Sequence, residues 1–314
     1  MSSTSAISNS AAGFEQHRRR LLGLAYRMLG SMADAEDAVQ EAYLRWHVAD
    51  RDKVSDPRAF LMTTTTRICL DMLTSARARR EEYVGPWLPE PVVDTAALAP
   101  DSRTELAEDL SVALLLILDR LSPLERAAFL LHDVFDFSFR EVSTALERSE
   151  AACRQLAARA RARVRAARPR GVTTPAAHSV DPKHAQLISA FAAATQSGDL
   201  NALTQLLASD VRVVTDGGGK VRAASDVIDG AERAAQFLVD VTRKRPGAWW
   251  REDFTVRFAT VNGLPALIVD APEGPVQTAA FEIEGDVIRA LYVVRNPDKL
   301  RHLAASPPHG SGRG

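Results

Sequence analysis

The chain has 314 residues, a formal net charge of −1, 46% hydrophobic residues and 25% charged residues. This length allows two or three domains with separate cores, and the composition excludes fibrous and largely disordered proteins. Charge is segregated along the chain, because eight arginines stand against one acid between Arg148 and Arg170 while Gly85–Arg120 is acidic. Such segregation predicts a local site for a polyanion rather than a generally basic protein.

Compartment and cofactors can be inferred from cysteines and apolar stretches. Cys69 and Cys153 are the only cysteines and fall within helical apolar patterns, so we expect buried free thiols in a reducing cytosol. Residues 1–13 lack the features of a signal peptide and are predicted to form a disordered tail, as are residues 304–314. Leu110–Leu121 is too short and too charged to span a bilayer. We therefore predict a cytoplasmic protein with no membrane partner, metal or cofactor.

Three helices are predicted in the N-terminal part of the chain. An apolar helical pattern covers Phe14–Leu29, and Gly30 ends it. Ala33–Trp46 is amphipathic: its core face includes Tyr43 and Trp46, and its outer face carries Asp34, Asp37, Gln40 and Glu41. A polar loop, His47–Asp56, precedes a third helix that runs to about Arg80. The outer face of the second helix could equally be a solvated surface.

The stretch Leu121–Arg170 has the pattern of a helix-turn-helix. Ser122-Pro123-Leu124-Glu125 and Ser138-Phe139-Arg140-Glu141 both have capping-box spacing, and Arg148-Ser149-Glu150 marks a third helix start just after Glu147. The third helix is strongly basic. A basic helix can be a solvated face, but a basic helix placed third in a capped trihelical unit can enter the major groove of DNA. DNA binding is therefore the leading hypothesis.

Two phrases in these segments resemble a known family. DAEDAVQEAYLRW (Asp34–Trp46) and DPRAFLMTTTTRICLDML (Asp56–Leu73) resemble region two of bacterial extracytoplasmic-function sigma factors, and Leu121–Arg168 resembles their region four. The resemblance implies region two over residues 14–84 and region four over residues 105–170. It also implies two partners, promoter DNA and core RNA polymerase, the latter bound through the clamp helices of its largest subunit and its flap.

The resemblance assigns residues to each partner. Polymerase binding falls on the outer face of the second helix, at Asp34, Asp37, Gln40 and Glu41. Recognition and melting of the −10 element fall on the loop His47–Asp56 and the third helix, at Arg58, Thr64, Thr65, Arg67, Arg77, Arg79 and Arg80. Reading of the −35 element falls on Arg148, Ser149, Arg154, Gln155, Arg159 and Arg161. Flipping a base out of the duplex costs a few kcal/mol, and cations along the separated strand help to offset this cost.

Three positions depart from the usual pattern of this family. Many such sigma factors carry Asn where Arg67 stands, Arg where Thr74 stands, and Gly where Glu147 stands. The recognition helix also begins with the small residues Ala151 and Ala152. Arg154 and Gln155 are therefore expected to be the direct base readers, since arginine matches guanine and glutamine matches adenine.

Segments of a different character separate and follow these regions. Residues 85–104 contain Trp87-Leu88-Pro89-Glu90-Pro91, whose prolines predict an extended linker. This acidic linker could imitate nucleic acid, or its tryptophan could be buried and hold the linker in place. Residues 171–180 form a second linker. Residues 181–303 alternate helices with strands, including an Asn262-Gly263 hairpin turn. We predict helices on one face of a curved antiparallel sheet, an α+β cone.

The motifs DGGGK and NPDKL in this last part resemble those of a SnoaL-like domain of the nuclear-transport-factor-two-like fold. Together with WLPEP they resemble the sigma-J-like group, which implies that the added domain regulates the sigma factor in cis. The fold class is therefore multi-domain, with two all-α domains followed by an α+β SnoaL-like cone. We expect DGGGK and NPDKL to contact the WLPEP linker or regions two and four, through Trp87, Leu88, Pro89, Glu90, Pro91, Asp216, Gly217, Gly218, Gly219, Lys220, Asn296, Pro297, Asp298, Lys299 and Leu300.

Relatives of the SnoaL-like fold include enzymes, so catalysis by this part of the chain is one hypothesis. The histidines of this part, His178, His184, His302 and His309, lie at its edges, and only Asp216 and Asp270 are candidate acids. The favoured hypothesis is a sigma factor without chemistry of its own. The alternatives are a helix-turn-helix regulator with a ligand-sensing C-terminal domain, or a SnoaL-type enzyme fused to a DNA-binding module. An unidentified small ligand in the cone is compatible with the favoured hypothesis.

Overall fold

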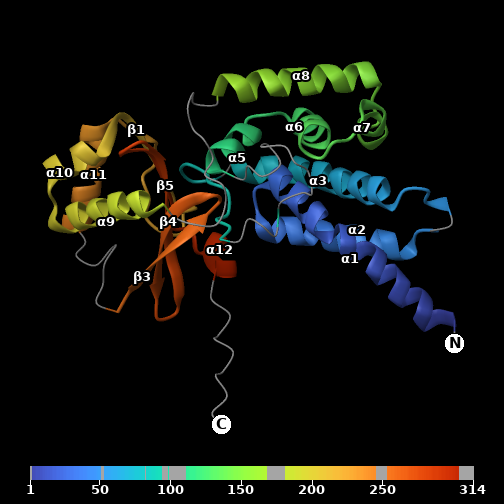
Figure 1. The fold of residues 1–314 in the computed structure, drawn as a ribbon, viewed down its shortest axis with the longest axis horizontal. Helices are drawn as coiled ribbons and strands as arrows, with labels where there is room; N and C mark the ends of the chain where they lie inside the picture. Colours follow the sequence, from blue (N-terminus) through green and yellow to red (C-terminus); the bar gives the residue numbers. More distant parts are fainter. Residues whose placement is uncertain are drawn as a thin grey trace, which may run out of the picture. The chain divides into compact units, whose positions relative to one another are not determined.

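The computed structural model describes residues 2–50, 53–81, 83–93, 98, 111–167, 181–244 and 253–303. The chain forms two compact units (Figure 1). The N-terminal unit comprises Met1–Glu82 and Asp94–Arg170, and the C-terminal unit comprises Tyr83–Val93 and Gly171–Gly314. The predicted linker 85–104 is thus divided, because its WLPEP part belongs to the C-terminal unit.

The N-terminal unit begins with α1 (Ser2–Leu29), α2 (Met32–Val48) and α3 (Pro57–Glu81). All three predicted helices are present, and Gly30 ends the first with φ +71°. The structure extends α1 back to Ser2, through a segment that is predicted as a disordered tail but holds helix-favouring alanines and no proline. The packing of α2 follows the prediction: Trp46 is buried and its ring centroid lies 5.8 Å from that of Phe60.

Residues 111–167 of the same unit form α5 (Val112–Asp119), α6 (Pro123–Phe129), the π-helical turn η3 (Leu130–Val134), α7 (Phe139–Leu146) and α8 (Glu150–Ala167). Both predicted capping boxes are formed, by Ser122 with Glu125 and by Ser138 with Glu141. The turn between α7 and α8 is made by Glu147 in the left-handed region, with φ 53°. The helix-turn-helix prediction is confirmed, whereas α5 and η3 were not anticipated.

The C-terminal unit has helices α9 (Pro182–Ser197), α10 (Leu200–Leu206) and α11 (Ala231–Lys244), and it ends in α12 (Pro297–Leu300) and the 3-10 turn η4 (Arg301–Leu303). Its six-stranded sheet has the order β2-β1-β6-β5-β4-β3. The strands are β1 (Leu207–Asp216), β2 (Ile228–Asp229), β3 (Thr255–Val261), β4 (Leu264–Ala271), β5 (Gly274–Glu284) and β6 (Val287–Val294). Figure 1 shows α9, α10 and α11 gathered on one side of the strands.

The core of this unit lies between those helices and one face of the sheet. Phe191 on α9 meets Phe281 on β5 edge to face, with ring centroids 5.3 Å apart, and Leu238 and Leu291 belong to the same cluster. The α+β cone is therefore confirmed. The purely antiparallel sheet is wrong, because β1 pairs parallel to β6. Hairpin signals fix the antiparallel meander β3-β4-β5-β6, but they carry no information on the direction in which β1 docks against it.

Both cysteines are free and buried, as predicted from their apolar patterns. Among the residues that the structure describes, no helix combines the length and apolarity needed to cross a membrane.

Candidate nucleic-acid interface and linker site

The outer face of α2 carries the four residues assigned to polymerase binding. Ser31 caps the helix by accepting a hydrogen bond from the Asp34 amide at 3.1 Å, which orients the acidic first turn. Asp37 and Gln40 are exposed. Glu41 is half-buried and pairs with Arg45 at 2.9 Å.

Two apolar residues extend this face towards the C-terminal end of α2. Leu44 is 54% exposed and Val48 is 82% exposed. They follow Asp37 and Gln40 at helical spacing, so acids and apolar groups share one strip of the helix. Sequence reasoning missed both residues, although they could have been found as apolar positions that lie off the core stripe. A strip of this kind suits docking to a protein better than a purely solvated face.

The residues assigned to the −10 element lie on α3, and two of them contact the helix-turn-helix. Arg58 Nη2 donates to the Phe135 carbonyl at 2.7 Å, and its guanidinium lies 5.0 Å from the Phe137 ring centroid. Arg67 donates to two carbonyls of α7 and pairs with Glu147. In this conformation both arginines are engaged by the chain itself.

The threonines of α3 are oriented inward or along the helix. The Thr64 hydroxyl donates to the Phe60 carbonyl at 2.8 Å. Thr65 is completely buried, so it cannot reach a DNA strand without a structural change. The side chains of Arg77, Arg79 and Arg80 lie outside the described residues.

The first turns of α8 carry the expected base readers. Arg154 and Gln155 are both exposed. Arg154 pairs with Glu150 at 2.6 Å and lies over the Phe139 ring at 5.3 Å, which fixes its direction. Ser149 acts as an N-terminal cap by accepting from the Ala152 amide at 3.2 Å. Nearby, the Arg148 side chain donates to the Glu147 carbonyl.

Arginines further along α8 are engaged within the helix-turn-helix. Arg159 and Arg163 pair with Glu125 at 2.9 and 2.7 Å, and Arg161 pairs with Asp133 at 2.6 Å. Burial acts to raise the pKa of the Glu125 carboxyl, but hydrogen bonds from Ser122 and Arg159 hold it below its usual value. Arg159 and Arg161 are expected to read or bind −35 DNA. In this conformation their ion pairs also fasten α8 to α6 and η3.

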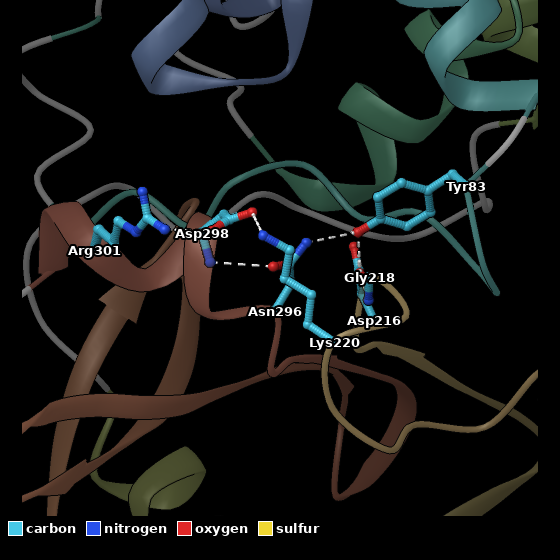
Figure 2. Close-up of polar contacts among 7 residues, drawn as sticks. All are labelled: Tyr83, Asp216, Gly218, Lys220, Asn296, Asp298 and Arg301. Carbon is cyan, nitrogen blue, oxygen red and sulfur yellow. Dashed lines mark hydrogen bonds and ion pairs between the residues drawn. The ribbon is translucent and has the colours of Figure 1, made fainter.

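The segment Tyr83–Val93, here called the strap, binds the C-terminal unit through Asp216. Asp216 ends β1 and is completely buried. Its carboxylate accepts from Tyr83 Oη at 2.5 Å, the Leu88 amide at 2.8 Å and the Gly218 amide at 3.0 Å. Figure 2 shows Tyr83, Asp216 and Gly218 together with Asn296. Burial and the bond to Asp216 raise the pKa of the Tyr83 hydroxyl, which keeps it a donor.

Lys299 on α12 completes this site. Only 6% of the residue is exposed. Its ammonium donates to Asp216 at 2.7 Å and to the Leu88 carbonyl at 2.5 Å, and it lies 4.4 Å from the Trp87 ring centroid and 4.9 Å from that of Tyr83. A buried charge is tolerated only when it is paired and hydrogen-bonded, and both conditions hold here. The Leu88 carbonyl and the two aromatic rings of the strap therefore replace part of the water that would solvate the Lys299 ammonium.

The glycines of DGGGK permit the close approach of strap and α12. Gly218 has φ +59°, and a Cβ there would collide with the Asn296 side chain and lie 3.0 Å from Tyr83 Oη. Gly219 has φ +70°, and a Cβ there would lie 3.2 Å from Val84. Any side chain would strain the backbone and push the strap away. Glycine at positions 218 and 219 is therefore what allows the strap to lie this close.

The NPDKL segment is organised around Asn296. Its Nδ2 donates to Tyr83 Oη at 3.0 Å, while its Oδ1 caps α12 by accepting from the Asp298 amide at 3.1 Å. Pro297 takes the first helical position, and Leu300 is buried. Asp298 pairs with Lys220 of DGGGK and with Arg301 at 2.6 Å. The hydrogen bond from Lys220 lowers the pKa of the Asp298 carboxyl.

The far end of the strap is also held. The Val92 amide donates to Asn262 Oδ1 at 3.1 Å, and a His302 ring nitrogen lies 2.6 Å from the Pro91 carbonyl. Leu88, Pro89, Glu90 and Pro91 are all buried. The structure thus brings together all three motifs expected to meet. Sequence reasoning missed Tyr83, Asn262 and His302; the aromatic position beside the linker was the available signal for Tyr83.

Both candidate catalytic acids are paired within the C-terminal unit. Asp216 is occupied by the strap and Lys299, as described above. Asp270 on β4 pairs with Arg257 on the neighbouring strand at 2.8 Å. Both carboxylates therefore have structural roles in this conformation.

Comparison with known proteins agrees with this architecture. Residues 14–79 match sigma-70 region 2 and residues 111–164 match sigma-70 region 4. The chain is 40% identical to the ECF RNA polymerase sigma factor SigJ of Mycobacterium tuberculosis, over 96% of this chain and 97% of that protein. It is 31% identical to the probable ECF RNA polymerase sigma factor SigI of the same species, over 94% and 96% of the two chains.

A solved structure is similar along nearly the whole chain. The crystal structure of Mycobacterium tuberculosis SigJ superposes with a TM-score of 0.68 and 34% identity, covering 93% of this chain and 98% of that one. Regions 2 and 4, the capped helix-turn-helix and the extent of these matches lead to one conclusion. The chain belongs to the extracytoplasmic-function (ECF) RNA polymerase sigma factors.

Proposed function

We propose that this sigma factor is controlled by its own C-terminal unit. That unit binds the strap, the segment that connects regions two and four in sequence. Sigma factors bind core RNA polymerase and promoter DNA as non-enzymatic subunits. The observation that carries the proposal is the buried Asp216–Lys299 pair, which binds the strap through Leu88 and Tyr83. Because the strap lies between the two DNA-binding regions in sequence, fixing it restricts the separations that those regions can adopt.

We assign polymerase binding to the outer face of α2. Asp34, Asp37, Gln40 and Glu41 would meet the clamp helices of the largest subunit, with Leu44 and Val48 continuing the contact. Region four would meet the flap, and the chain would act in the cytoplasm with the polymerase. The exposure of Leu44 and Val48 supports the assignment, because large exposed apolar groups beside acids are typical of protein interfaces.

We assign −35 reading to Arg154 and Gln155. Both are exposed in the first turns of α8, where a recognition helix contacts base edges. Arg148 and Ser149 lie at the start of α8 and would bind phosphate. Arg159 and Arg161 would act indirectly, by fixing α8 on α6 and η3.

The experiment is in-vitro transcription with core polymerase on a promoter library. It compares the full-length chain, a truncation after Arg170, and Lys299→Met with Lys220→Met as a control that removes a lysine from the exposed pair nearby. We expect promoter-dependent initiation whose level or promoter preference changes with truncation and with Lys299→Met, and changes little with Lys220→Met. Initiation that is identical for all forms would reject control by the C-terminal unit.

A small ligand in the cone could change the activity of the sigma factor only by binding one conformation of the chain more tightly than another. Adding cell metabolite extract to the transcription assay tests for such a ligand. A response by the full-length chain that the truncation lacks would support it.

A further inference from the structure

Arg67 and Glu147, two positions that depart from the usual family pattern, meet one another in the N-terminal unit. The Arg67 Nη2 atom lies 3.1 Å from Glu147 Oε1. Arg67 is on α3 in region two, and Glu147 is the turn residue between α7 and α8 in region four. The pair therefore joins the two regions.

Arg67 also completes the hydrogen bonding of α7. The last carbonyls of a helix have no partner within it, and they form the negative end of the helix dipole. Arg67 Nη2 donates to the Thr144 carbonyl at 2.8 Å, and its Nε donates to the Ala145 carbonyl at 3.1 Å. A side chain of region two thus caps a helix of region four.

A second arginine of α3 makes a similar contact before α7 begins. Arg58 donates to the Phe135 carbonyl at 2.7 Å and stacks over Phe137 at 5.0 Å. The two arginines therefore bind the turns at both ends of α7. Between them α3 and α7 leave an open pocket of about 630 Å³, lined by residues that include Phe60, Thr63 and Arg140.

Glu147 is an unfavourable residue for the turn that it occupies. Its φ of 53° is in the left-handed region, where a non-glycine residue costs roughly 1 kcal/mol relative to glycine. Its side chain is 71% exposed, so burial of the side chain does not offset this cost. The ion pair with Arg67 is what glycine could not provide.

We propose that Arg58, Arg67 and Glu147 form an autoinhibitory latch, which holds region four on α3 when the protein is free. The proposal rests on the proposed function and on the expected assignment of Arg58 and Arg67 to the −10 element. Arginine donors that bind the carbonyls of Phe135, Thr144 and Ala145 are not available to DNA, and the two regions must separate to reach two promoter elements. DNA or polymerase that favours the separated state shifts the population towards it.

The latch is suited to reversible opening because its ion pair is exposed. Arg67 and Glu147 have side-chain exposures of 42% and 71%, so salt screens their attraction. The closed form should therefore lose population as ionic strength rises.

The test measures the separation of the regions in the free full-length protein by energy transfer between dyes. Cysteines are introduced at the exposed positions Asp71 on α3 and Ala166 on α8. The native thiols Cys69 and Cys153 are buried, which raises their pKa and slows labelling. We expect Arg67→Ala to lower the closed-to-open ratio about tenfold and Glu147→Gly to lower it about two- to fivefold, as charged hydrogen bonds outweigh an exposed ion pair.

Glu147→Gly is the most informative variant. Glycine relieves the left-handed strain, so the helix-turn-helix keeps or gains thermal stability while the latch weakens. Because Arg67 remains and is released, binding to a pool of single-stranded oligonucleotides should rise about two- to fivefold, and this rise should vanish in Arg67→Ala/Glu147→Gly. Arg18→Ala, which removes an exposed arginine from α1, is the matched control.

Two results would overturn the latch: energy transfer unchanged by Arg67→Ala, or changed as strongly by Arg18→Ala. Because this measurement contains no polymerase, it can fail while promoter-dependent transcription succeeds. Failure of transcription alone would instead reject the proposed function.

Discussion

Each unit of this chain contains an ion pair that joins segments distant in sequence, and the two ion pairs differ mainly in their exposure to solvent. The Lys299 and Asp216 side chains of the C-terminal unit are 8% and 0% exposed. The Arg67 and Glu147 side chains of the N-terminal unit are 42% and 71% exposed. Both contacts combine a carboxylate with backbone carbonyls, so their chemistry is similar while their surroundings are opposite.

The difference in exposure separates a permanent contact from a reversible one. Removing one partner of a buried ion pair typically costs about 3–5 kcal/mol, because the other charge is left desolvated. An exposed pair contributes about 0–1 kcal/mol and is screened by salt. The strap is therefore expected to stay on the C-terminal unit as part of its fold. The latch is expected to open at a small cost in free energy.

The largest expected effect is that of Lys299→Met, which would break the buried contact. Methionine has a similar length but leaves the Asp216 carboxylate without its cation, so the C-terminal unit should lose roughly 3–5 kcal/mol of stability. Amide exchange of the strap and of β1, measured by mass spectrometry, gives the local unfolding free energy.

A double variant separates loss of charge pairing from loss of packing. In Lys299→Met/Asp216→Asn the uncompensated charge is gone, so part of the stability should return. Protection of the strap that stays at the wild-type level in Lys299→Met would show that the pair is not what holds it.

Local features of this fold are specified by the sequence more directly than contacts between distant residues. Helix caps are local, so the boxes at Ser122 and Ser138 and the basic α8 were predicted correctly. The meeting of DGGGK and NPDKL with the strap was expected from motifs alone. Which atoms meet depends on three-dimensional placement, and Tyr83, a central donor to Asp216, was missed.

Partnerships between distant charges were the least predictable feature. The arginine pattern of α8 does not reveal that Arg159 and Arg161 face Glu125 and Asp133, because that depends on the crossing of α8 over α6. Arg67 and Glu147 were both noticed as departures from the family, yet only the structure pairs them. The parallel docking of β1 on β6 is another long-range choice that local turn signals leave open.

A second prediction concerns Glu125, which is buried like Asp216 but lies in the N-terminal unit with Arg67. Glu125→Gln should destabilise the helix-turn-helix by about 1.5–3 kcal/mol, because two arginines and a cap lose a charged acceptor. The lowered pKa of Glu125 means that its contribution is complete above its unfolded value of roughly 4.3 and is lost as pH falls through the lower folded value. Thermal unfolding at pH 7 and pH 3 measures this.

The matched control is Glu141→Gln, which alters the equivalent capping box at the start of α7 in an exposed position. We expect a loss of about 0.5–1 kcal/mol there. Equal losses for the two variants would show that Glu125 acts only as a cap and not as the anchor of α8.

The Tyr83 hydroxyl is an uncharged donor to the buried Asp216 carboxylate. Tyr83→Phe removes one donor to Asp216 and the acceptor of Asn296 while keeping the ring near Lys299. The strap should lose about 1 kcal/mol of protection, which would raise its amide exchange rate roughly fivefold. A change as large as that of Lys299→Met would mean that the hydroxyl, and not the ion pair, dominates the site.

The smallest effect is expected for the exposed pair Lys220–Asp298, which lies beside the buried site yet resembles the latch in exposure, at 51% and 39%. Asp298→Asn should cost about 0.2–1 kcal/mol at low salt and less at high salt. The lowered pKa of Asp298 means that its contribution is present above the ordinary aspartate value of roughly 3.9 and is lost as pH falls through the folded value. Strap exchange measured at two ionic strengths decides the matter. If Asp298→Asn released the strap as fully as Lys299→Met, exposure would not be what distinguishes a fixed contact from a reversible one in this protein.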